Sequence, residues 1–320
     1  MRETQTSFEI YIRNRFLYPK IARSAELRDW LVAAGPASLD IAASLSAKIG
    51  AKLATIESTD FPDGESKIRV VDDVRNRSVI IVQSTYPPVD KHFMQILLLS
   101  HKLSEEGADV HAVVPYLGYA RQDKEFLKGE IVSLGVIAHL LRSVGVKRLV
   151  TVDIHSMQCL GLFSFPVYST SAIRMLAEYV GTSFSLQNPI AVSPDFGSST
   201  RVEAFAEVLK CEHVSFKKTR DRVTGEVKTE DMKLDLEDRD AVIIDDMIST
   251  GGSVVKAAQL LKKNGARKVI ASCTHAVMVS GAAERMKSAG VDEIISTNTI
   301  PTKFSRVDVS PLIASYFETL

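Results

Sequence analysis

The sequence predicts an α/β protein made of two similar halves, each containing a mostly parallel sheet flanked by helices. Apolar, β-rich runs alternate along the chain with helical patterns. The strand runs are uniformly apolar, as expected when both faces of a sheet are covered. One strand–helix–strand unit occurs twice, and a length of 320 residues exceeds the ~100–200 of a usual single domain. Two domains of one fold class are therefore expected.

The expected elements follow one another from residue 31 onward, with short apolar runs as strands and longer periodic stretches as helices. Strands are expected at 79–82, 110–114, 149–152, 190–192, 241–244, 268–272 and 293–296. Helices are expected at 90–106, 133–143, 251–263 and 281–289. This order of strand and helix is typical of parallel sheets.

The two copies of the internal repeat are the stretches 73–119 and 238–277. Each runs strand, loop, helix, glycine and strand, and Leu97 and Leu260 fall at equivalent helix positions. The alternative, that any two α/β segments look alike at this level, stays open. We expect the copies to join near residues 164–171. The expected division is an N-terminal extension (1–30), two domains (31–166 and 167–309) and a C-terminal helix (310–320) that could pack back on the first domain.

Composition limits the function classes. The 39 basic and 39 acidic side chains cancel, so no overall field draws the chain to nucleic acid or to an anionic membrane, and anion binding must be local. Three widely spaced cysteines exclude a disulfide framework and a clustered zinc site, and they fit the reducing cytoplasm. No apolar run approaches the ~18 residues of a membrane span. Residues 1–30 are basic without an apolar core, so a secretory signal is not expected.

The sharpest local pattern follows the strand expected at 241–244. Two adjacent acids, Asp245 and Asp246, precede a small glycine-containing turn that opens a helix. Ligands of open α/β sheets bind at the carboxyl ends of strands, and N–H groups at a helix start bind anions. We expect the acids to accept hydrogen bonds from sugar hydroxyls and the turn to hold a phosphate. The residues of this turn are Ser249, Thr250, Gly251, Gly252 and Ser253. The alternative, a plain helix cap, needs neither two acids nor two glycines.

Two further motifs suit a nucleotide. Phe61 offers an aromatic face, and Asp63 and Glu65 could accept from an amino group or a ribose, although Pro62–Asp63–Gly64 also makes a good turn. Arg121, Gln122 and Asp123 follow the strand expected at 110–114, where a guanidinium suits bidentate phosphate contact. The alternative for this second motif is a solvated loop.

Three other segments carry charge or metal chemistry. His155 and Asp195 each follow an expected strand, and Mg²⁺ prefers carboxylate oxygens, although a lone histidine is often structural. Lys217, Lys218 and Arg220 open a polar excursion over 217–240. A mobile basic loop there could close over phosphates and stabilise migrating negative charge. The alternative is a lysine-rich loop that serves solubility alone.

Together, these motifs resemble the ribose-phosphate pyrophosphokinase (PRPP synthetase) family, whose two domains have the phosphoribosyltransferase fold. The supporting segments are 61–65, 119–123, 151–155, 193–195, 218–220 and the acidic glycine loop at 245–253. They occur in the family's order with similar spacing, and the resemblance runs from about Gly35 to the C-terminus. Departures include Ser249, where many members have Asp, and Ile131, where Pro is common.

The resemblance implies transfer of a pyrophosphoryl group from Mg-ATP to ribose 5-phosphate, giving PRPP and AMP. It assigns the first domain to ATP, with Phe61, Asp63, Gly64, Glu65, Arg121, Gln122 and Asp123 as contacts. It assigns the second domain to ribose 5-phosphate, with Asp245, Asp246, Arg220 and residues 249–253. Lys218, Arg220 and His155 become catalytic candidates, and His155 and Asp195 become Mg²⁺ candidates. His155 could instead act through water or directly on ATP.

The resemblance also implies a homo-oligomer with the ATP site near a subunit interface. Two rival functions remain open at this stage. A phosphoribosyltransferase that consumes PRPP would explain the acidic loop but not the nucleotide motifs. A catalytically silent regulatory relative would not need Lys218, Arg220, His155 and Asp245.

Overall fold

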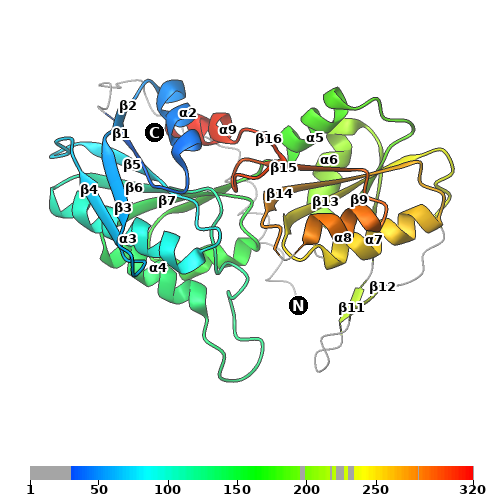
Figure 1. The fold of residues 1–320 in the computed structure, drawn as a ribbon, viewed down its shortest axis with the longest axis horizontal. Helices are drawn as coiled ribbons and strands as arrows, with labels where there is room; N and C mark the ends of the chain where they lie inside the picture. Colours follow the sequence, from blue (N-terminus) through cyan, green and yellow to red (C-terminus); the bar gives the residue numbers. More distant parts are fainter. Residues whose placement is uncertain are drawn as a thin grey trace, which may run out of the picture.

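The computed structural model describes residues 30–194, 199–216, 218–220, 227–229, 234–279 and 281–319, and it describes the two short strands at 218–220 and 227–229 by their backbone. These residues form two α/β lobes side by side, with the N-terminal lobe on the left of Figure 1. Each lobe contains one parallel six-stranded sheet.

The two sheets have the same topology. In spatial order, the first contains β2 (Lys52–Ala54), β1 (Trp30–Ala34), β5 (Ser78–Val82), β6 (Asp109–Val114), β7 (Val146–Val152) and β8 (Val167–Thr170). The second contains β10 (Glu212–Ser215), β9 (Ile190–Ser193), β13 (Asp240–Ile248), β14 (Lys268–Ala276), β15 (Glu293–Thr297) and β16 (Ser305–Val307). Numbered within its own half, each sheet has the strand order 2-1-3-4-5-6. The expected α/β class and the duplicated unit are confirmed.

An antiparallel strand pair is inserted at the same place in both halves, between the second and third strands of the sheet. In the first half the pair is β3 (Ile56–Asp60) and β4 (Ser66–Val70). In the second half it is β11 (Lys218–Arg220) and β12 (Val227–Thr229). The duplication therefore includes the insertion as well as the sheet.

Helices cover both faces of each sheet, which explains why the strand runs are apolar throughout. The first sheet lies between α3 (Val89–Glu105) with α4 (Ser133–Ser143) on one face and α2 (Leu39–Ile49) on the other. The second lies between α7 (Gly252–Lys263) with α8 (Ala282–Ser288) and α5 (Ile173–Ser183) with α6 (Ser199–Leu209). A short 3-10 helix, η1 (Met157–Leu162), follows β7.

The C-terminal helix α9 (Ser310–Phe317) returns to the first lobe. Ile313, Ala314 and Phe317 share an apolar cluster with Ile41 and Leu45 of α2, and Figure 1 shows α9 in red beside that helix. The last helix in the sequence thus completes the core of the first half.

Two sequence-based boundaries differ from the structure. The strand expected to end at 244 continues to Ile248, because β13 remains paired with β14 as far as Ile248 and Ala276. Asp245 and Asp246 therefore lie inside a strand rather than after it. The joint expected between residues 166 and 167 falls just before β8, which pairs in parallel with β7 and so belongs to the first sheet.

Buried polar contacts fix the two lobes against each other. Ser84 Oγ donates to Thr299 O at 2.6 Å, and both residues are fully buried. His275 Nε2 lies 3.1 Å from Val152 O, where a protonated Nε2 would donate. Because unpaired buried polar groups are costly, these contacts favour one relative placement of the halves.

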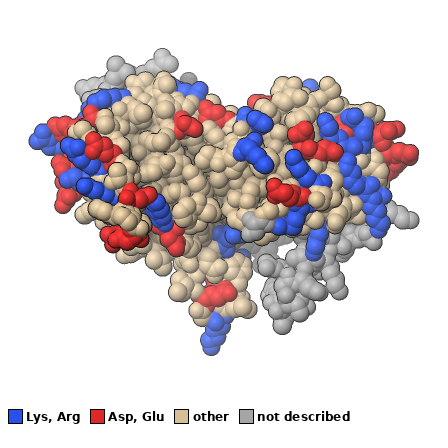
Figure 2. Space-filling view, viewed as in Figure 1, with Lys and Arg blue, Asp and Glu red and all other residues tan. Residues whose placement is uncertain are grey.

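The surface carries charge of both signs. Figure 2 shows lysine and arginine interspersed with aspartate and glutamate on both lobes of the displayed face. Within the described part of the chain, each helix is too short or too polar to cross a bilayer.

Candidate active site

The acidic glycine loop encloses a small pocket at the carboxyl end of β13. Gly251 has φ of 76°, the left-handed conformation that glycine adopts without strain, and it precedes the first turn of α7. Arg285 Nη2 donates to Thr250 O at 2.7 Å and holds the turn against α8. The pocket has a volume of about 220 Å³ and is lined by Arg121, His155 and residues 245–254. Amide groups at the start of α7 suit an anion there.

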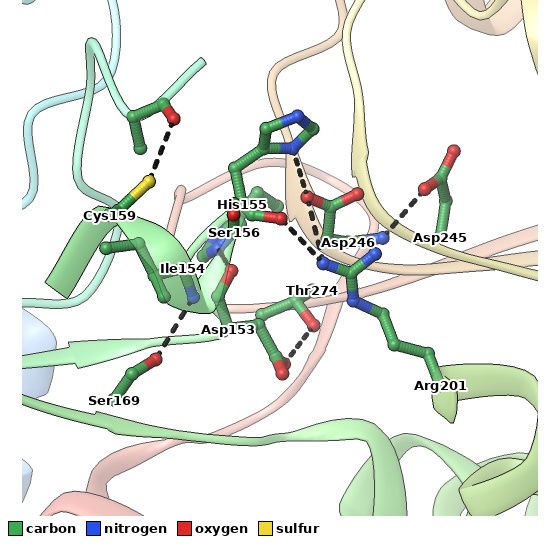
Figure 3. A network of polar contacts seen from close by, with 12 residues as sticks. Asp153, Ile154, His155, Ser156, Cys159, Ser169, Arg201, Asp245, Asp246 and Thr274 are labelled. Atoms are coloured by element: carbon green, nitrogen blue, oxygen red, sulfur yellow. Dashed lines mark hydrogen bonds and ion pairs between the residues drawn. The ribbon is translucent and has the colours of Figure 1, made fainter. Parts of the chain in front are cut away.

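The two acids differ in their surroundings. Asp245 accepts a 2.9 Å bond from the backbone N–H of Asp246. The Asp246 side chain is only 4% exposed, and its Oδ2 lies 2.8 Å from His155 Nδ1 and 3.5 Å from Arg201 Nη2. Figure 3 shows the side chains of the two acids on opposite sides of the strand. The acids therefore have distinct neighbours within one pocket.

Asp246 is held in its ionised form. Burial alone would raise the pKa of this carboxyl, but the hydrogen bond from His155 and the charge of Arg201 outweigh burial and keep the pKa well below its usual range. Because an ionised carboxylate only accepts, His155 donates through Nδ1. The imidazole ring can therefore meet a ligand only through Nε2.

His155 stands on a rigid base formed by Asp153. Asp153 has φ of 40°, uncommon for a residue other than glycine, and is buried. Its Oδ2 accepts from Ala172 N at 2.9 Å and from Thr274 Oγ1 of β14 at 2.6 Å. A buried carboxylate with two donors restrains the turn between β7 and His155.

Arg121 and Gln122 line a second, larger cleft of about 1170 Å³. It is bounded by Val89, residues 116–122, residues 124–127, Glu130 and Met247. Gly118 permits the close approach of this loop to the start of α3, because an added Cβ would lie 2.9 Å from Val89 Cγ1. Arg121 and Met247 line both pockets, so the two spaces adjoin. Asp123 does not line either pocket, and its Oδ2 accepts from Cys159 Sγ at 3.6 Å.

The 61–65 motif lies at the tip of the β3–β4 hairpin. Phe61 N donates to Glu65 O at 2.8 Å, and Gly64 has φ of 97°, so the motif forms a tight turn. Phe61 is 49% exposed, and Asp63, Gly64 and Glu65 are exposed too. Neither pocket is lined by these residues, so this chain by itself does not bring them to the site.

The remaining predicted residues are described only in part. Asp195 and Lys217 lie outside the described residues. Lys218 and Arg220 form part of the backbone of β11. Among the residues with described side chains, no group of three or more His, Cys, Asp or Glu gathers to hold a metal.

Sequence reasoning missed two neighbours of the site. Met247 separates the pockets, and its apolar character gave no signal. Arg201 lies in the first turn of α6, where the helix dipole disfavours a cation. A cation at such a position indicates a nearby anion, and this was the available signal for Arg201.

Two parallel sheets of one topology, with an acid pair and a glycine turn at a strand end, define a protein with phosphoribosyltransferase-type domains. Residues 30–145 match the N-terminal domain of ribose phosphate pyrophosphokinase, and residues 231–315 match the phosphoribosyl synthetase-associated domain. The chain belongs to the ribose-phosphate pyrophosphokinase family, as the motifs predicted.

Individual relatives cover almost the whole chain. The ribose-phosphate pyrophosphokinase of Methanothermobacter thermautotrophicus is 40% identical over 87% of this chain and 96% of its own length. That of Sulfurisphaera tokodaii is 38% identical over 89% of this chain and 99% of its own length. The crystal structure of phosphoribosylpyrophosphate synthetase from Mycobacterium smegmatis is 30% identical, covers 91% of this chain and 98% of its own, and superposes with a TM-score of 0.80.

Proposed function

We propose that this chain transfers the pyrophosphoryl group of ATP to the C1 hydroxyl of ribose 5-phosphate, giving PRPP and AMP. The observation that carries the proposal is the adjacency of the two pockets, which share Arg121 and Met247. A donor nucleotide in the larger cleft would place its phosphates beside a sugar phosphate in the smaller pocket. The C1 hydroxyl oxygen bonds to the β-phosphorus and releases its proton to solvent, the bond from that phosphorus to the α–β bridging oxygen breaks, and AMP leaves with that oxygen.

The chain's own residues would bind and orient the two substrates. The turn at 249–253 offers amides to the sugar phosphate, and Asp245 accepts from a ribose hydroxyl. Asp246 faces His155 and Arg201, so we assign it chiefly to holding His155. Arg121 and Gln122 contact ATP, while Lys218 and Arg220 supply positive charge to the migrating group. Asp123 and the 61–65 turn complete the expected ATP contacts.

Mg²⁺ fits this site as an ion that arrives with ATP. Magnesium usually binds through one or two carboxylates together with substrate phosphates. His155 and Asp195 are the proposed protein partners, and the pocket side of His155 is Nε2. When bound, the ion would neutralise charge on the phosphates. A cytoplasmic location belongs to the same proposal, because the three cysteines are free thiols.

The decisive experiment follows AMP while the purified chain is incubated with ribose 5-phosphate and Mg-ATP. AMP formed only when both substrates are present supports the proposal. A phosphoribosyltransferase would instead consume PRPP and a base without ATP, and its activity would refute the assignment. A catalytically silent regulatory relative would show neither reaction.

The catalytic assignment of Lys218 has its own test. We expect Lys218→Ala to lower kcat by about a hundredfold or more, as loss of one donor to a charged transition state does elsewhere. Unchanged activity would remove Lys218 from the catalytic set.

We also propose that a second copy of the chain supplies the 61–65 turn to the ATP cleft. The exposed position of this turn, away from the pocket linings of its own chain, supports that arrangement. Specific activity should then fall on dilution, and Phe61→Ala should raise the KM for ATP. An isolated monomer with full activity would contradict an intersubunit site.

A further inference from the structure

One carboxylate oxygen joins three separate elements of the fold. Asp246 extends from β13 of the second sheet, His155 follows β7 of the first sheet, and Arg201 comes from α6. Arg201 Nη2 lies 3.5 Å from Asp246 Oδ2 and donates to the backbone oxygen of His155 at 3.0 Å. Figure 3 shows the guanidinium directed toward both groups. Arg201 therefore contacts the two residues that meet across the lobes.

Asp246 needs a compensating positive charge, such as that of Arg201, because its carboxylate is buried. The Asp246 side chain is 4% exposed, and a buried carboxylate is stable only with compensating charge and hydrogen bonds. The planar guanidinium can serve a carboxylate and a carbonyl in one geometry, whereas a lysine ammonium is a point charge on a flexible stem. Arg201 is itself only 20% exposed, so its side chain is held in place.

The contact to the His155 carbonyl is what gives Arg201 a role beyond charge balance. It fixes the backbone that carries the imidazole, while the ring is fixed separately through Nδ1. Neither contact uses Nε2. The histidine is thus held at two points from the second half, although it belongs to the first half.

We propose that Arg201 is a positioning residue, which locks His155 to Asp246 and so fixes the part of the smaller pocket that comes from the first lobe relative to the part that comes from the second. The inference rests on the proposed function and extends it to a residue that does not itself line either pocket. Misplacement of a reacting group by about 1 Å can cost about a hundredfold in rate.

The test replaces Arg201 with Met and uses Arg174→Met as the matched control. Arg174 lies on α5 and also pairs with a carboxylate of α6, that of Glu207, but both partners are largely exposed. We expect Arg201→Met to lower kcat by about tenfold to a hundredfold with the KM for each substrate within about twofold. Arg174→Met should match the wild type.

A second readout does not depend on activity. Amide hydrogen exchange in the peptide spanning 153–156 should become faster in Arg201→Met and stay unchanged in Arg174→Met. Arg201→Lys keeps the charge but replaces the planar guanidinium with an ammonium on a flexible stem, and we expect it to recover part of kcat. Should Arg201→Met fail to fold, Arg201→Lys must still lower kcat several-fold at unchanged KM.

Three results would overturn the proposal. One is an unchanged kcat in a folded Arg201→Met. Another is a raised KM at unchanged kcat, which would make Arg201 a direct substrate contact. The third is a wild-type kcat in Arg201→Lys when Arg201→Met does not fold. Failure of the proposed function is distinguishable, because the wild type would then form no AMP while the exchange comparison could still be made.

Discussion

Replacing Thr274 with Val removes one hydroxyl from the buried contact between the lobes. In the wild type, Thr274 Oγ1 donates to Asp153 Oδ2 at 2.6 Å, and Thr274 is fully buried. Valine has nearly the same shape, so the packing changes little while the donor is lost. Asp153 keeps its bond from Ala172 N. The variant therefore isolates one hydrogen bond to a buried carboxylate.

The expected cost is that of a hydrogen bond to a charged group, about 1.5–3 kcal/mol. At about 2–4 °C per kcal/mol for domains of this size, the melting temperature should fall by about 3–12 °C. Because Asp153 supports the turn that carries His155, kcat should fall as well. Differential scanning calorimetry and AMP formation measure the two effects.

Thr182→Val is the matched control. Its hydroxyl is exposed on α5 and bonds to Glu178 O of its own helix at 2.8 Å. Its melting temperature should stay close to that of the wild type, because such surface changes are usually within about 0.5 kcal/mol. Equal melting temperatures for Thr274→Val and Thr182→Val would refute the claim that this contact stabilises the joined lobes.

Three other predictions concern charge, pocket lining and thiols. Asp246 has a lowered pKa in the folded state, so its stabilising contribution is complete above its unfolded pKa of about 4 and is lost as the pH falls toward the folded value. In urea unfolding, the stability difference between wild type and Asp246→Asn should shrink from about pH 6 to 3, and a constant difference would contradict this. Arg121→Met should raise the KM for both substrates, because Arg121 lines both pockets, whereas Arg142→Met should raise neither, because Arg142 lies on the exposed side of α4. Burial raises the pKa of Cys159 to about 11 and also raises the pKa values of Cys211 and Cys273, so native thiols should react slowly with a disulfide reagent at about pH 8 and quickly in urea.

The sequence was most informative where a local pattern determines local structure. Most of the uniformly apolar central strands were found because sheets covered on both faces require such runs, but β1 (Trp30–Ala34) was not among the expected strands. The edge strands β2, β8, β10 and β16, each of three or four residues, were also not among the expected strands. The extension of β13 through Asp245 and Asp246 was missed because aspartate is uncommon in strands. In the structure, pairing with β14 keeps these residues in the strand.

The site was predictable in its parts but not in its connections. Asp246 and His155 were each singled out, yet their contact joins positions 91 residues apart and depends on how the lobes meet. Arg201 took part in no recognised motif. The position of the 61–65 turn relative to the pockets also depends on the three-dimensional path of the hairpin rather than on its residues.

The duplication has led to different uses of the same strand end in the two lobes. Where β13 leads into the turn that lines the smaller pocket, its counterpart β5 leads into Gln83, Ser84 and Thr85, which are fully buried, with Ser84 bonded to the opposite lobe. Expressed separately, the N-terminal lobe would uncover these groups and lose α9 from its core. The two lobes are therefore not expected to work as separate fragments. Dividing this enzyme would first require redesign of the residues that the two lobes bury against each other.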